Sequence, residues 1–73
     1  MTDIQLTLLK CKARIEVKYY EVRTRVFRAK REAGWTWHQA TEAAEIAAHE
    51  VWIREHRKLE AEFAYDHALL ALI

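Results

Sequence analysis

Apolar residues recur every three or four positions through the first half of the chain, which is the spacing that places side chains on one face of an α-helix. Thr2 and Gln5 fit a capping box, in which two side chains satisfy free backbone amides at the start of a helix. Residues 2–33 contain no glycine, proline or asparagine, so this stretch offers no easy turn. We therefore predict a helix over about residues 3–33. Its apolar face, the first stripe, consists of Ile4, Leu8, Cys11, Ile15, Tyr19, Val22, Val26, Ala29 and Ala33.

Residues 10–19 also alternate between polar and apolar side chains, which is the period of a half-buried β-strand. Ile15, Val17 and Tyr19 are strand-favouring residues within this segment. A strand running through the whole first half would exceed the usual length of about 3–10 residues, and a β-hairpin would need a turn. The helix is therefore the main prediction, and an α+β fold with a β-rich N-terminal half is the alternative.

The only glycine, Gly34, lies near the midpoint of the chain and suits the left-handed position that ends a helix. Thr36 and Gln39 form a second capping box, so a second helix is expected to start at Trp37 and to run to about residue 72. The charged residues at 54–58 mark the place where this helix would bend or end. Trp35 and Trp37 are expected to pack at the tip of the hairpin. The small apolar face of the second helix consists of Ala40, Ala43, Ala44, Ala47, Ala48 and Val51.

The first helix carries a second set of apolar residues, roughly opposite the first stripe. This second row consists of Leu6, Leu9, Ala13, Val17, Tyr20 and Phe27. A helix packed against one neighbour buries one stripe, so the second helix can cover only one of the two faces. We predict an all-α antiparallel helical hairpin that forms a single domain over residues 1–73 and dimerises into a four-helix bundle. The alternative is that the second row stays exposed.

The length and composition of the chain agree with a need for a partner. A monomer of 73 residues buries a small core, and such scaffolds usually rely on disulfides, a metal or another chain. A single cysteine excludes an internal disulfide framework and indicates a reducing compartment. The first residues lack the pattern of a secretory signal, and the longest apolar run is far too short to span a bilayer. We therefore expect a soluble cytoplasmic protein.

Charge divides the chain into two unlike halves. Residues 1–33 carry nine lysines and arginines against four acidic residues, a net charge of +5. Residues 34–73 carry three basic residues against seven acidic ones, a net charge of −4. Opposite charges suit two segments that fold back on each other.

The sequence offers little for catalysis or for holding a cofactor. It contains no serine, and Cys11 lies on the first stripe, where a small buried thiol is the usual interpretation. A single glycine excludes a glycine-rich phosphate loop. The histidines are too far apart along the helix to share a metal ion, since their closest step separates two imidazoles by about 10 Å. We expect no enzyme activity, no cofactor and no metal, and read the histidines as flanking an apolar face: they are His38, His49, His56 and His67.

The second row favours a non-enzymatic protein-binding function as a regulator, inhibitor or adaptor, with self-association and a larger protein partner, and with neither a membrane nor a small-molecule substrate. Buried aromatic residues commonly dominate the energy of such interfaces. The candidate anchors are Leu6, Val17, Tyr20, Phe27, Trp52 and Phe63.

A basic edge on the first helix supports an alternative function, the binding of RNA or DNA by a hairpin dimer. A third reading is a structural subunit of a larger assembly. In size and pattern the architecture resembles small plasmid RNA-binding hairpin dimers and short helical-hairpin inhibitors and adaptors encoded by phages and mobile elements; the resemblance transfers no residues. The residues of the basic edge are Lys10, Arg14, Lys18, Arg25 and Arg28.

Overall fold

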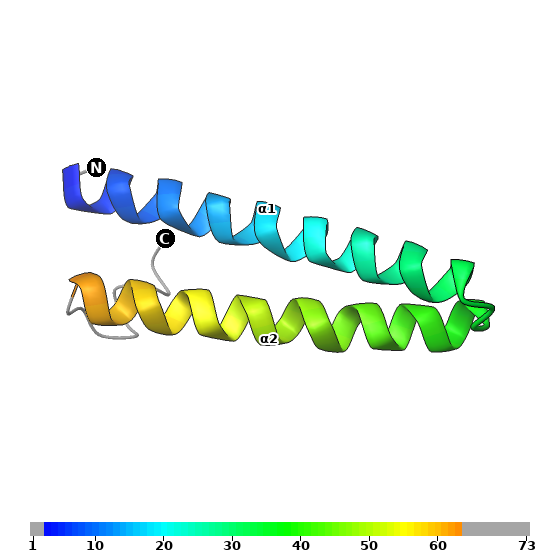
Figure 1. Ribbon diagram of the computed structural model, residues 1–73. Helices are drawn as coiled ribbons and strands as arrows, with labels where there is room; N and C mark the ends of the chain where they lie inside the picture. The colour runs from blue at the N-terminus through cyan, green and yellow to red at the C-terminus, as the bar shows by residue number, and fades with distance from the viewer. Residues whose placement is uncertain (1–2, 64–73) are drawn as a thin grey trace.

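The computed structural model describes residues 3–63 and places them in two helices, α1 (Asp3–Glu32) and α2 (Trp37–Phe63). The helices lie side by side and antiparallel, joined by a short turn (Figure 1). This confirms the predicted helical hairpin. The alternative of a β-rich N-terminal half is wrong, because residues 10–19 are helical throughout. Apolar residues that recur every three or four positions in this segment pack against α2, whereas the alternation of polar and apolar residues in 10–19 does not form a strand.

The turn is closed by a Schellman motif centred on Gly34. Its backbone has φ +92°, the left-handed conformation that favours glycine. The Gly34 amide donates to the carbonyl of Arg31 at 3.1 Å, and the Trp35 amide donates to the carbonyl of Lys30 at 3.0 Å. These are the two bonds that satisfy the last carbonyls of a helix in this motif. The Lys30 ammonium also lies 4.3 Å from the centre of the Trp35 ring, so backbone and side chains close the turn together.

The start of α2 is fixed by the predicted capping box. The Gln39 amide donates to the hydroxyl of Thr36, and the Thr36 amide donates to the side-chain oxygen of Gln39, each at 3.2 Å. Two amides that would otherwise lack a partner at the helix start are satisfied by this exchange. The corresponding box at Thr2 cannot be placed, since residue 2 lies outside the described range.

The interface between the helices has two parts. Away from the turn, Leu8 and Ile15 of α1 are buried with Leu59 of α2, and the half-buried Cys11 packs against them. Towards the turn, the buried residues of α2 are Ala40, Ala44 and Ala48. Small side chains allow two helix backbones to approach closely, and the two ribbons converge towards the turn in Figure 1. The predicted small face of α2 therefore does face α1.

The charged residues at 54–58 do not bend or end α2, which continues through them to Phe63. Glu55 lies in this segment and points its carboxylate towards α1, where Lys18 meets it at 3.4 Å. The charged residues are thus compatible with a continuous helix, because Glu55 forms an ion pair with α1. The predicted continuation of the helix from residue 64 to residue 72 falls outside the described range.

Candidate functional site

The second row, apart from Phe27, lies on the surface of α1 that α2 leaves exposed. Leu6 is 44% exposed, Val17 56% and Tyr20 60%, whereas Leu8 on the first stripe is fully buried. The separation of the two faces follows from helical geometry. Residues three or four positions apart lie on the same face of a helix, whereas residues two positions apart, such as Leu6 and Leu8, do not. The sequence-predicted anchors Leu6, Val17 and Tyr20 therefore lie on one face of α1 and are open to solvent.

This face carries no charged side chain over five turns of helix. Its only polar position between Tyr20 and Phe27 is Thr24, which continues the row by helical spacing. A shallow hollow along α1 begins here. It is lined by Val17, Tyr20, Thr24 and Ala29 and by the charged residues Glu21, Arg25, Arg28 and Glu32. An exposed apolar helix face with a hollow bordered by charged side chains is a surface against which another helix can pack.

Phe27, the fourth predicted anchor on α1, is partly used within the hairpin. Its ring meets Trp37 of α2 edge to face, with centroids 4.7 Å apart, and it is half-buried. Aromatic pairs of this geometry add stability beyond the area they bury. Trp37 itself remains exposed, so the pair extends the apolar surface from α1 onto α2 near the turn.

Trp52, the predicted anchor on α2, is packed between two histidines. The centre of its ring lies 3.9 Å from that of His56 and 6.1 Å from that of His49. His56 is buried and its Nδ1 lies 3.0 Å from the carbonyl oxygen of Trp52; because a carbonyl only accepts, Nδ1 carries the proton in this contact. Trp52 keeps one edge exposed. Phe63 ends α2, and its side chain lies outside the described part of the structure.

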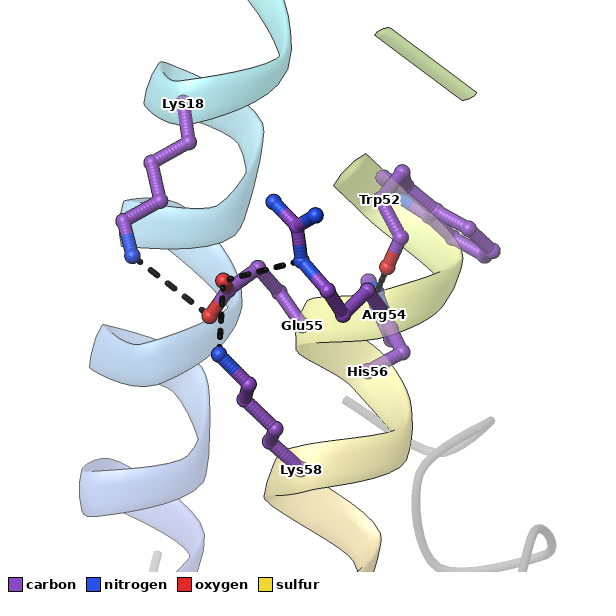
Figure 2. Close-up of polar contacts among 6 residues, drawn as sticks. All are labelled: Lys18, Trp52, Arg54, Glu55, His56 and Lys58. Atoms are coloured by element: carbon purple, nitrogen blue, oxygen red, sulfur yellow. Dashed lines mark hydrogen bonds and ion pairs between the residues drawn. The ribbon is translucent and has the colours of Figure 1, made fainter. Parts of the chain in front are cut away.

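An ion cluster centred on Glu55 lies next to the pair of Trp52 and His56. Figure 2 shows the Glu55 carboxylate pointing towards α1, with Trp52 and His56 on the same stretch of α2. Glu55 accepts from Lys18 of α1 at 3.4 Å and from Lys58 at 3.5 Å, and Arg54 approaches to 4.0 Å. This cluster links the two helices.

The pKa of Glu55 records the balance of this cluster. Partial burial raises the pKa of the carboxyl, but the positive charges and hydrogen bonds of Lys18 and Lys58 outweigh burial and lower it below its ordinary value of 4.5. Glu55 is therefore ionised in the folded protein, and its ionised form favours the hairpin.

The basic edge predicted for nucleic acid is divided by this arrangement. Lys18 is engaged by Glu55, and Arg14 lines a groove between the helices that also contains the acidic Glu62. Arg25 and Arg28 lie further along α1 beside the hollow of the second row, where Glu21 accompanies them. Lys10 is exposed on α1. The five cations do not form one uninterrupted positive surface.

The histidine line of the sequence is also divided. His38 and His49 are exposed while His56 is buried, and His67 lies outside the described residues. Within residues 3–63, no group of three or more histidines, cysteines and acidic residues is placed to hold a metal ion. Neither helix, over the same residues, has an apolar stretch long enough to cross a bilayer.

Comparisons of the chain with models of protein families, with curated proteins and with solved structures give no significant match. The geometry of the hairpin alone therefore carries the functional argument.

Two ion pairs between the helices were not predicted from the sequence. The pairing of Lys18 with Glu55 and that of Arg23 with Glu45, at 3.4 Å, both join α1 to α2. The sequence signal for them was the opposite net charge of the two halves, which predicts attraction but not which residues meet, since that depends on the alignment of the two helices.

Proposed function

We propose that this chain is a small, non-enzymatic protein-binding module, a regulator, inhibitor or adaptor, whose main binding surface is the second row of α1. The observation that supports this most directly is the exposure of an uncharged apolar face, with Tyr20 60% exposed at its centre. Exposed apolar surfaces of this continuity mark interaction sites in proteins of this size.

The chemistry of the row suits a helical partner. An amphipathic helix docks through apolar side chains at intervals of three and four residues, and Leu6, Val17 and Tyr20 of α1 offer a matching face. Exposed aromatic residues lose little conformational entropy on binding and contribute large contact areas. Tyr20 is therefore the main anchor, and the exposed edge of Trp52 is a second contact point on α2.

Nucleic acid is a less favoured partner for the same chain. Phosphate binding needs cations that are free to release counterions, and Lys18 is held by Glu55 in the hairpin. Glu21 lies close to Arg25 and Arg28 along the same hollow and opposes a negative ligand.

A capture experiment with matched variants tests the proposal. The tagged full chain, a Leu6→Ala/Tyr20→Ala variant and an Ile46→Ala control are each incubated with extract of the native cells, with and without nuclease. Ile46 is as exposed as Val17 but belongs to α2. We expect a stoichiometric protein that survives nuclease, is kept by the control and is lost by the double variant.

Two outcomes would refute the proposal. Capture that is unchanged in the Leu6→Ala/Tyr20→Ala variant would remove the second row from the interface. Loss of all captured protein after nuclease treatment would transfer the function to the basic residues of α1. Circular dichroism of each variant checks that helicity is retained.

A further inference from the structure

Four charged residues border the second row along one edge of α1. Asp3, Lys10, Glu21 and Arg28 follow one another at steps of 7, 11 and 7 residues, and each step returns to the same side of a helix to within about 20°. Within residues 3–63 none of the four side chains makes an ion pair, although other charged residues of α1 do. The edge of the row therefore holds charges that the hairpin itself does not use.

The order of these charges is negative, positive, negative, positive along α1. A second copy of α1 that runs antiparallel presents the reverse order, so each charge meets its opposite: Asp3 meets Arg28 of the second copy, and Lys10 meets Glu21. In a second copy that runs parallel, the same edge would lie on the far side of the interface, so these four charges would not meet one another. Charge complementarity therefore favours one orientation of one partner, another copy of the same chain.

The alignment that pairs these charges also suits the apolar residues between them. A two-fold axis near residues 15 and 16 places Tyr20 between Leu9 and Ala13 of the second copy. The small side chain of Ala13 leaves room for the large ring, as knobs enter holes in packed helices. The hollow lined by Val17, Tyr20 and Thr24 then faces Leu6 and Leu9 of the second copy.

We propose that a second copy of this chain covers the second row, with the two α1 helices packed antiparallel about a two-fold axis. This inference rests on the proposed function, because it names the partner of the same surface. The second row lies roughly opposite the first stripe, so the two α2 helices lie on the outside of a layer of four helices. The exposed edge of Trp52 remains available to a different protein. Association also supplies the additional burial that a small hairpin needs.

The test is a charge exchange followed by analytical ultracentrifugation of the full chain over a range of concentrations. The wild-type protein is expected to sediment as a species of twice the 8.7 kDa chain mass. Lys10→Glu and Glu21→Lys each place like charges together, and because the two-fold axis repeats each contact, we expect about tenfold weaker association for either one. The Lys10→Glu/Glu21→Lys variant restores opposite charges and is expected to recover the wild-type association.

The control is Arg57→Glu, which changes the net charge as Lys10→Glu does but affects an exposed residue of α2. It is expected to leave association within about twofold of wild type, since surface substitutions away from an interface have small effects. Neither Lys10 nor Glu21 makes an ion pair within the described hairpin, so helicity measured by circular dichroism is expected to stay unchanged in all four variants.

Three results would overturn the inference. The first is a wild-type chain that is monomeric at every concentration measured. The second is a dimer that both single variants leave unchanged, and the third is a double variant that associates no better than the singles. A monomeric wild-type chain whose captured protein is still lost in Leu6→Ala/Tyr20→Ala would refute the dimer and leave the proposed function intact.

Discussion

The two apolar faces of α1 are built from similar residues but have opposite surroundings. Leu8 on the first stripe is fully buried, and Leu6, two residues earlier on the second row, is 44% exposed. The difference is not in the residue type, since both are leucines on the same turn of helix. It arises because α2 is a single helix and reaches one side of α1.

This comparison separates the energetics of the hairpin from those of association. Burial of apolar surface stabilises whichever structure removes it from water. Leu8 and Ile15 of the first stripe are removed from water by α2 and therefore stabilise the fold. The prediction was wrong at the two ends of the stripe, where Ile4 is 63% exposed and Ala29 and Ala33 are also exposed, because α2 does not cover those positions. The second row can contribute only when something else covers it.

The largest effect that distinguishes the two faces is expected from the leucine pair. Leu8→Ala removes a side chain that is 0% exposed and should reduce the free energy of unfolding by about 2–5 kcal/mol. Leu6→Ala should change it by less than about 0.5 kcal/mol when the second row is uncovered. Urea denaturation followed by circular dichroism, at low protein concentration, measures both. Equal losses in the two variants would show that the faces do not differ as described.

A smaller loss of stability is expected from a substitution in the turn that joins α1 to α2. Gly34 has φ +92° and open space around the position of a Cβ atom, so Gly34→Ala creates backbone strain and no clash. We expect a loss of roughly 1–2 kcal/mol, the cost of a left-handed conformation for a residue with a Cβ.

Gly34→Asn is the matched control for that change, because asparagine tolerates the left-handed region better than alanine. Thermal denaturation of both variants should rank wild type, asparagine and alanine in decreasing order of stability. An alanine variant as stable as wild type would show that the turn does not require glycine.

The smallest expected effect on stability concerns Glu55, which forms ion pairs with Lys18 and Lys58 beside the interface between the helices. Partial burial raises the pKa of Glu55, but the positive charges of Lys18 and Lys58 lower it by more. The pKa therefore lies below its ordinary value of 4.5. A lowered folded-state pKa stabilises the hairpin above the unfolded-state pKa, and this contribution is lost as pH falls through the folded-state value.

Glu55→Gln should therefore reduce stability at pH 7 by less than about 1 kcal/mol, since the partner ammonium groups are largely exposed to solvent. The difference between variant and wild type should disappear as the pH is lowered below 4.5 and through the folded-state pKa. Melting temperatures measured from pH 7 to pH 2 check this. A difference that persists at the acid end would show that Glu55 acts through packing and not through its charge.

Local sequence signals predicted the secondary structure and the turn because each signal acts within a few residues. The capping box of Thr36 and Gln39 and the left-handed Gly34 are set by neighbouring backbone groups, and both are confirmed. The charged residues at 54–58 misled the same reasoning. Their local pattern suggested an interruption, but Glu55 finds its partner Lys18 on the other helix, which no local signal can report.

The sequence by itself determined that there are two helices, where they meet, and that α1 has two apolar faces, because helical periodicity and capping depend on short-range spacing. The tertiary structure decided which face is covered and which charges are used. Phe27 packs on Trp37, His56 is buried beside Trp52, and Lys18 is taken by Glu55. These outcomes depend on the alignment of α1 against α2, which is a property of the folded hairpin. It leaves most of the second row open, and within residues 3–63 its bordering charges form no ion pair.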